Sequence, residues 1–296
     1  MQKPLLLILA IIAAAGLALN PVQAEEALIV RHYQAQERYA FGQDILDLAL
    51  SKLNRPYRIL TPETQIVNEK RGEMQIIEGR LDLEWMSTSR EREESLIPVR
   101  IPIYRGLLGL RLILATKDGQ AAIEQVSSLD ALRDFTGGHG SHWGDLPVYA
   151  ANGLKVWTNA RYNTLFKQLI GGKFDYFHRG LIEIWEEQAK YADDLAIADN
   201  VMLFYPHPVY FLVSRHRPEL AELLEQGLNK AIADGSYEKL FLDRFGPYIE
   251  RANLAERRLI ILQNPVVPPG TPAIDTSWWM PENHQTAMEA AHQPKN

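Results

Sequence analysis

Short apolar segments typical of strands alternate along this chain with segments whose apolar residues recur at helical spacing. Residues 27–30 have the pattern of a short buried strand, and the apolar positions between 45 and 53 then repeat as in an amphipathic helix. A second strand pattern at 58–60 and a helical pattern at 74–79 follow, before a third strand pattern at 81–85. Repeated strand–helix–strand units predict an α/β fold with mostly parallel sheets.

Two longer β-prone runs stand out, at residues 106–115 and 205–214. Gly106 and Gly109 in the first run permit a bend or a close backbone approach, and prolines interrupt the second. The remaining predicted elements are a helix at 162–169 capped by Asn159 and ended by Gly171 and Gly172, a strand at 174–177, a helix at 182–191, and a helix from 220 that ends at Gly235.

The first 24 residues resemble a secretory signal peptide. Lys3 gives a short positive start, residues 5–19 are apolar but too short for a comfortable membrane span, and Ala24 ends a small-residue cleavage site. The alternative is an uncleaved anchor helix. Because no later stretch approaches a membrane span, we expect cleavage after Ala24 and a free, soluble protein in the periplasm.

Charge and cysteine content exclude several classes of function. The chain has 31 Lys and Arg against 37 Asp and Glu, which gives a net charge of -6 and argues against broad nucleic-acid binding. Cysteine is absent, so disulfides, thiolate catalysis, cysteine zinc sites and a lipid-anchored cysteine are excluded.

The tail from residue 263 to residue 296 is rich in proline and lacks periodicity, so we expect an extended arm. Trp278 and Trp279 are unusual in such an arm. They either dock on the body of the protein or belong to a loose tail.

Several motifs, taken in order, resemble those of the bacterial extracellular solute-binding proteins of family 3, the periplasmic receptors typified by amino-acid uptake systems. The matching segments are Glu78–Asp82, Ser87–Arg92, Ile101–Tyr104, Ser128–Leu132, Gly140–His142, Gly171–Asp175 and Leu220–Phe245. The resemblance covers roughly residues 27–250. It implies the two-lobed periplasmic-binding-protein-like fold, in which two crossover segments join the lobes.

The resemblance also implies how the chain is divided into lobes, which class of ligand it binds and which partner receives the ligand. Lobe one would comprise residues 25–105 and 208–262, and lobe two residues 106–207. The two β-prone runs then fall at the crossovers. A monomer would close around a small carboxylate-bearing ligand, amino-acid-like or acidic, and deliver it to an ABC permease. A sensory protein that reports to a membrane partner is the alternative.

The loop from Ser87 to Arg92 is the first candidate site, because the hydroxyl and arginine of this loop grip the ligand's carboxylate in the family. Ser87, Thr88, Arg90 and Arg92 are therefore candidates, and the spacing leaves open which arginine faces inward. A charged surface turn is the alternative. Trp85, just before the loop, either floors the cleft or lies in the core.

The second candidate site is the turn Gly140-Ser141-His142, which matches the family's backbone and hydroxyl donors to the carboxylate. The alternative is a glycine-rich connection. His139 and His142 lack a third metal ligand at a telling spacing, so we expect neither a metal nor another cofactor.

The third candidate site is Arg179 with Glu183, where the chain departs from the family. Amino-acid receptors place an acidic residue there for the ligand's ammonium group, whereas an arginine prefers an anion. This departure favours an acidic solute. Glu183 either binds an amine or forms an i,i+4 surface pair with Arg179.

Residues at the crossovers complete the candidates. Tyr104, Arg105 and Arg111 flank the first crossover, and Tyr205 and His207 the second, so each is a candidate cleft or hinge residue. No catalytic motif is present, and we therefore expect a binding protein. The same fold also hosts periplasmic dehydratases, so a dehydratase-like enzyme is the alternative.

Overall fold

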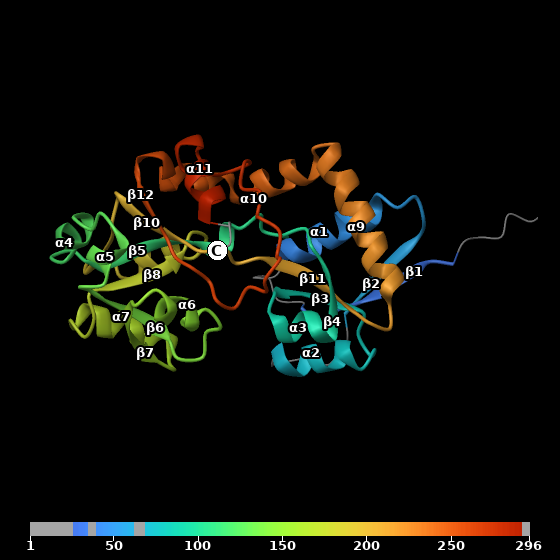
Figure 1. The fold of residues 1–296 in the computed structure, drawn as a ribbon, viewed down its shortest axis with the longest axis horizontal. Coiled ribbons are helices and arrows are strands. Elements are labelled where there is room, and N and C mark those ends of the chain that lie inside the picture. Colours follow the sequence, from blue (N-terminus) through green and yellow to red (C-terminus); the bar gives the residue numbers. More distant parts are fainter. Residues whose placement is uncertain (1–25, 35–39, 62–68, 292–296) are drawn as a thin grey trace, which may run out of the picture.

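The computed structural model describes residues 26–34, 40–61 and 69–291. The predicted signal peptide lies outside these residues. The chain forms two halves that lie side by side along the long axis (Figure 1). Within the described ranges, no helix is long and apolar enough to cross a membrane.

The first half contains a two-stranded sheet and a three-stranded sheet with helices around them. Its elements are β1 (Leu28–Arg31), α1 (Ala40–Ser51), β2 (Tyr57–Leu60), α2 (Glu69–Ile77), β3 (Leu83–Ser87), α3 (Arg90–Ser95), β4 (Leu96–Val99), β11 (Val209–Ser214) and α9 (Pro218–Ala233). The strand and helix patterns predicted from residues 27–85 are all found here.

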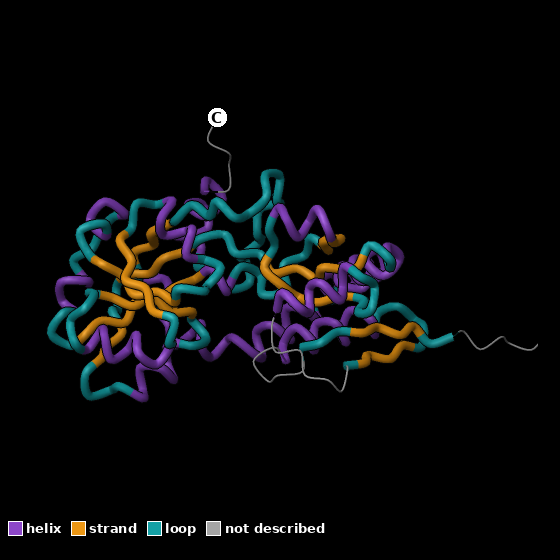
Figure 2. Tube along the Cα trace, turned by 90° about the horizontal axis from the view of Figure 1, so that it is seen from below, coloured by secondary structure: helices purple, strands orange, loops and turns teal. Residues whose placement is uncertain are grey.

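The second half is built on a seven-stranded sheet in the order β12-β10-β5-β8-β6-β7, with β9 also paired to β5. Its elements are β5 (Leu110–Thr116), α4 (Gln120–Glu124), α5 (Leu129–Leu132), β6 (Thr136–Gly140), α6 (Leu146–Ala151), β7 (Lys155–Asn159), α7 (Tyr162–Ile170), β8 (Tyr176–Gly180), α8 (Ile184–Lys190), β9 (Leu195–Ile197), β10 (Val201–Phe204) and β12 (Arg258–Ile261). Figure 2 shows the two groups of strands well separated.

The strands β5 and β11, which follow the two crossovers, run against their neighbours. β5 pairs antiparallel with β8, β9 and β10, and β11 pairs antiparallel with β3 and β4. All pairings that do not involve these two strands are parallel. The α/β fold class is thus confirmed. The seven-stranded sheet is mixed because β5 enters it from a crossover, and the three-stranded sheet is antiparallel because β11 lies between β3 and β4.

The structure departs from the predicted boundaries at β12. This strand lies at the end of the segment expected in lobe one, yet it pairs in parallel with β10 in the second half. It reaches that sheet through α10 (Ser236–Ala252) and a short 3-10 turn at Leu254–Glu256. The sequence of this four-residue strand does not indicate which strand it pairs with. The other lobe boundaries stay a prediction.

The cap predicted for the helix at 162–169 is wrong. The N-cap of α7 is Arg161, and the Asn159 side chain instead accepts a hydrogen bond from the Arg161 N–H at 2.8 Å. The helix ends at Gly171, as predicted, and Gly172 follows with a φ of 66°.

The tail is not uniformly extended. It ends in a helix, α11 (Glu282–Ala291), and both tryptophans dock on the body. The docked form was one of the two alternatives that the sequence left open. Trp279 and Met280 belong to the same apolar cluster as Phe41 in the first half and Phe166 in the second, so one core runs through both halves.

Helices α1 and α9 pack closely because a glycine lies at their contact. A Cβ on Gly227 of α9 would lie 2.1 Å from the carbonyl oxygen of Ala49 in α1. Gly246 of α10 offers the matched case, since a Cβ there meets no described atom within 4 Å.

We therefore predict that Gly227→Ala destabilises the protein by about 2–3 kcal/mol, because the methyl group pushes the two helices apart. Gly246→Ala is the control and should change the stability by less than about 1 kcal/mol, because the helix preference of alanine is opposed by the following Pro247. Urea unfolding of the two variants measures both effects. Equal stabilities would contradict this account of the contact.

Two histidines are buried without charged partners that would hold them protonated. His32 is fully buried against Trp85, and neither of its ring nitrogens has a hydrogen-bond partner in the structure described. Burial lowers the pKa of His32 to about 4. Burial, followed by the charge of His139, also lowers the pKa of His178 well below its ordinary value.

We predict that the protein loses stability as the pH falls below about 6.5. The unfolded chain takes up protons there, while the buried rings stay neutral until a lower pH. For His32 alone, the free energy of unfolding should fall by about 2 kcal/mol between pH 7 and pH 5. Urea unfolding at both pH values measures it, and His32→Phe should show a smaller fall. The same fall in both proteins would refute the assignment.

Candidate functional site

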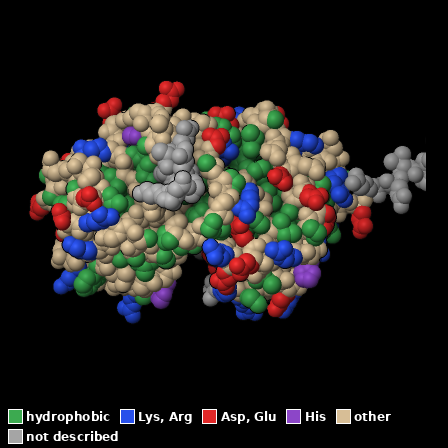
Figure 3. Space-filling model, in the orientation of Figure 1, with side chains coloured by type: hydrophobic (Ala, Val, Ile, Leu, Met, Phe, Trp, Pro, Cys, Tyr) green, Lys and Arg blue, Asp and Glu red, His purple; other side chains and the backbone are tan. Residues whose placement is uncertain are grey.

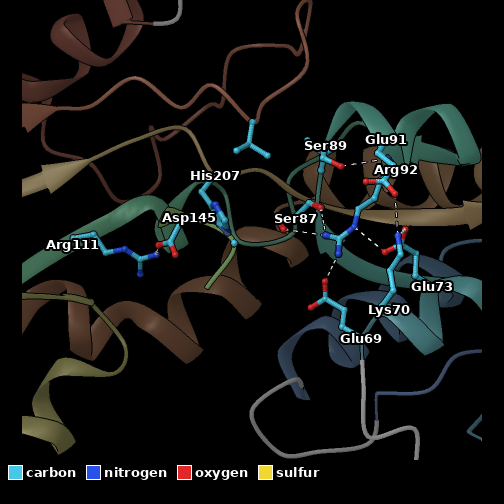
Figure 4. Close-up of a pocket in the computed structure, with 13 residues that line it drawn as sticks. Glu69, Lys70, Glu73, Ser87, Ser89, Glu91, Arg92, Arg111, Asp145 and His207 are labelled. Carbon is cyan, nitrogen blue, oxygen red and sulfur yellow. Dashed lines mark hydrogen bonds and ion pairs between the residues drawn. The ribbon is translucent and has the colours of Figure 1, made fainter. Parts of the chain in front are cut away.

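A cleft of about 400 Å³ opens between the two halves. Its residues come from α2 and the β3–α3 loop on one side, and from β5, the β6–α6 loop and the second crossover on the other (Figure 4). Figure 3 shows a notch between the two halves at the lower edge of the molecule. The lining residues are Glu69, Lys70, Glu73, Ser87, Thr88, Ser89, Glu91, Arg92, Arg111, Gly144, Asp145, His207 and Val266.

The first wall is organised by the start of α3. Ser89 is the N-cap, and its hydroxyl accepts a hydrogen bond from the Arg92 N–H at 3.3 Å. This cap turns the Arg92 side chain back along the loop, where its Nη1 donates to the Ser87 carbonyl oxygen at 2.6 Å and to the Ser87 hydroxyl at 3.2 Å. Arg92 is thus the arginine of the loop that faces the cleft.

Carboxylates of α2 already occupy the other nitrogens of Arg92. Its Nε donates to Glu73 at 3.3 Å, and its Nη2 donates to Glu69. Lys70 bridges Glu73 and Glu91 at 3.2 and 3.1 Å. The first wall therefore carries three carboxylates and two cations, and its guanidinium is held within the wall (Figure 4).

The opposite wall is a compact ion pair. Arg111 donates from Nη2 to Asp145 at 2.9 Å and from Nε to the hydroxyl of Tyr205 at 2.8 Å. The Tyr205 hydroxyl donates to the same Asp145 oxygen at 2.5 Å. β5 supplies the arginine, β10 ends just before the tyrosine, and the residue before α6 supplies the carboxylate, so three elements meet here.

Asp145 is held ionised by its neighbours. Burial alone would raise its pKa, but the contacts with His139, Arg111 and Tyr205 outweigh burial and hold the pKa well below its usual range. His139 Nε2 lies 3.2 Å from Asp145 Oδ1, and its Nδ1 lies 2.8 Å from the Gly140 carbonyl oxygen. Both imidazole nitrogens thus lie near oxygen atoms.

His207 lines the cleft from the second crossover. Burial, with a smaller effect of the Arg111 charge, lowers its pKa to about 4, so the ring is neutral at neutral pH. It adds a hydrogen-bonding group to the cleft without adding charge. In all, four carboxylates and three cationic side chains line the cleft.

Three of the residues predicted for the first site lie where they were expected. Ser87, Thr88 and Arg92 line the cleft. Arg90 is exposed on α3 and lies outside the cleft. Both arginines lie in α3 only two residues apart, and residues at this spacing on a helix point in different directions.

Two predicted aromatic residues belong to the core. Trp85 is 3% exposed and packs against His32 and Phe211. Tyr104 is buried against Phe41 and Phe245. Neither is among the residues that line the cleft, so the core alternative holds for Trp85.

The second predicted site lies a few residues before the part of the β6–α6 loop that lines the cleft. Gly140, Ser141 and His142 are not lining residues, but Gly144 and Asp145 directly after them are. Gly140 ends β6 beneath the indole of Trp143, which a Cβ at Gly140 would meet at 2.3 Å. Glycine is therefore required at position 140 by the packing of Trp143 and not by a ligand.

Arg179 and Glu183 form part of a closed cluster instead of a ligand site. Arg179 is 6% exposed, and its guanidinium makes two hydrogen bonds of 2.7 Å to Glu187 and one of 2.9 Å to Glu183. The predicted anion clamp has no cleft to act in, because neither residue lines it. Sequence spacing identified the Glu183 pair but missed Glu187, one helical turn further on.

Several cleft residues lacked a signal in the sequence. The α2 residues Glu69, Lys70 and Glu73 have the pattern of a solvated helix face, and Val266 lies in a tail that shows no periodicity. Arg111 and His207, in contrast, were among the crossover candidates, and both line the cleft. The other crossover candidates, Tyr104, Arg105 and Tyr205, are not among the lining residues.

Solved structures give distant matches to the chain. YCKB of Bacillus subtilis is 14% identical, covers 74% of this chain and 90% of its own, and has a TM-score of 0.52. An ancestral arginine-binding protein bound to arginine is 17% identical, with coverages of 76% and 100% and a TM-score of 0.49. The substrate-binding protein of an amino acid ABC transporter is 15% identical, with coverages of 75% and 100% and a TM-score of 0.47.

No family model and no curated protein matches the chain. The similarity to YCKB supports a common fold. The two halves, the two crossovers and the cleft between the halves agree with this fold. The chain therefore has the two-lobed periplasmic-binding-protein-like fold that its motifs predicted.

Proposed function

We propose that this protein is a periplasmic solute-binding protein that closes its two halves around a small polar, carboxylate-bearing solute for uptake by an ABC permease. The observation that supports this proposal most is the cleft between the halves, with a guanidinium on each wall. Its volume of about 400 Å³ suits a ligand of amino-acid size. The family motifs support the uptake role.

Arg111 is the proposed partner of the ligand's carboxylate. Its Nε and Nη2 are bonded to Tyr205 and Asp145, but its Nη1 makes no hydrogen bond to any described residue. A buried, charged donor with a free N–H is a strong site for an anionic oxygen. Arg92, which the family motif favours, is instead engaged by Glu69, Glu73 and Ser87.

The balance of charge favours a solute that carries a positive group as well. Glu69 and Glu91 are 56% and 78% exposed in their side chains and keep carboxylate oxygens available at the first wall. A purely anionic solute would have to compete with these carboxylates for Arg92 and Lys70. We therefore propose an amino-acid-like solute, with its carboxylate on Arg111 and its cationic group toward α2.

Binding is a better account of the cleft than catalysis. Asp145 stays ionised and His207 stays neutral at neutral pH, because the pKa of each group lies well below neutral pH. A general acid or base works best with a pKa near the operating pH. Such groups suit fixed electrostatic roles. A ligand that touches both walls makes contacts that only the closed arrangement offers, and so stabilises closure.

We predict that at least one member of a panel of amino acids, dicarboxylates and small peptides raises the melting temperature of the exported protein. Arg111→Gln should weaken binding of that compound by roughly tenfold to a hundredfold, because a hydrogen bond to a charged group is lost. Isothermal titration calorimetry measures this change.

Arg90→Gln provides the control, since it makes the same substitution at an exposed arginine of α3 that lies outside the cleft. It should leave the affinity unchanged. If Arg90→Gln abolished binding and Arg111→Gln did not, the ligand would not sit on the second wall. If no compound of the panel bound the folded protein, the proposed solute class would be wrong.

A further inference from the structure

The tail beyond β12 leaves the second half, passes over the cleft and reaches the first half. In Figure 1 it runs from β12 across the front of the molecule before it returns to α11 near the top. The hinge segments, defined as residues 100–109 and 205–208, lie beneath this path. We call this segment, residues 263–281, the strap.

The strap is fastened to the second half at its start. The Asn152 side chain, at the end of α6, donates to the Gln263 carbonyl oxygen at 2.8 Å and accepts from the Gln263 N–H at 2.9 Å. Asn264 then donates to the carbonyl oxygen of Pro206 in the second hinge segment at 2.8 Å. The two bonds to Gln263 involve its backbone groups, whereas the bond to Pro206 depends on the Asn264 side chain.

The middle of the strap enters the cleft region. Val266 and Val267 line a narrow extension of the cleft, together with Thr88 of the first half and Asp145 of the second. Both side chains are half-buried, and separation of the halves would expose more of their apolar surface to water, which is unfavourable. The strap therefore opposes opening at the cleft itself.

The far end of the strap is fastened at Arg105, in the first hinge segment. This arginine has a left-handed φ of 46°, is 6% exposed and forms an ion pair with Asp275. Its guanidinium lies 3.9 Å from the ring centre of Trp278, and its carbonyl oxygen accepts from the indole N–H of Trp279 at 2.8 Å. Three residues of the strap thus hold one hinge residue.

Trp278 carries this attachment onto the first half. Its ring packs on Tyr237 and Phe241 of α10, at centroid distances of 5.3 and 6.0 Å. Phe241 in turn meets Phe41 of α1. The strap is thus fastened to the second half at its start, and at its far end to a hinge segment and to the part of α10 that packs on α1. The prolines at 265, 268, 269 and 272 stiffen the chain between the two fastenings.

We propose that the strap ties the two halves together and limits how far the cleft opens. In a two-lobed protein without such a segment, only the crossovers resist separation of the lobes. Here a fourth chain segment, beyond the two hinge segments and α10, must stretch or detach before the halves can move apart. This role is independent of the identity of the solute.

The absence of cysteine allows a direct test by spin labelling. Arg90→Cys on α3 and Ala160→Cys after β7 place one label on an exposed position of each half. Pulsed electron–electron double resonance then gives the distribution of distances between them in the full, ligand-free chain. We expect a narrow distribution.

Two changes release the strap in different ways. Trp278→Ala removes the far fastening, and Trp278→Phe is the matched control because it keeps an aromatic ring over Arg105. Alternatively, a recognition sequence for a site-specific protease is inserted after the exposed Gly270, so that cleavage breaks the chain between the two fastenings. Trp278→Ala and cleavage should both shift the distribution to longer, broader distances.

The cleaved protein gives the decisive test, because the chain has already folded when the protease cuts it. If it keeps its far-ultraviolet circular dichroism and its original distance distribution, the strap does not restrain the halves and the proposal is wrong. A shift after cleavage, with Trp278→Phe unchanged, supports it. Should Trp278→Ala fail to fold, the comparison of cut and uncut chains still gives the answer.

Discussion

The antiparallel pairing of β5 and β11 with their neighbours is the constraint on which the rest of the structure depends. Each strand directly follows a crossover, and each is largely buried. Their backbone hydrogen bonds anchor the crossover at once in the sheet that the chain has just entered. The ends of the crossovers are thereby fixed. Ser87 at the end of β3, Arg111 near the start of β5 and His207 in the second crossover then line the same cleft.

The charges of the cleft are arranged so that each wall is stable without a ligand. Arg92 is paired with carboxylates of α2, and Arg111 is paired with Asp145. Removal of these groups from water without partners would cost several kcal/mol per charge, so partners from the same half are needed while the cleft is empty. A ligand then competes with a neighbour rather than with water alone, which raises specificity at the expense of affinity.

Sequence periodicity predicted most of the fold, since the buried faces of α1, α7 and α9 follow their apolar repeats. It predicted the candidate site only in part. Ser87, Thr88 and Arg92 were found because the loop before α3 has a family pattern, whereas Arg179 was misassigned because its partner Glu187 is identified only when α8 folds onto β8. Glu73 and Val266 reach the cleft through tertiary contacts that local spacing does not encode.

The apolar cluster that joins Phe41, Phe166 and Trp279 has a consequence for how the molecule comes apart. Two lobes with separate cores can melt independently, but here the loss of either half strips the other of part of its own interior. The protein should accordingly behave in calorimetry as a single cooperative unit, even though its backbone is divided into two halves. Division into two halves and independence in unfolding are thus separate properties, and we expect the first here without the second.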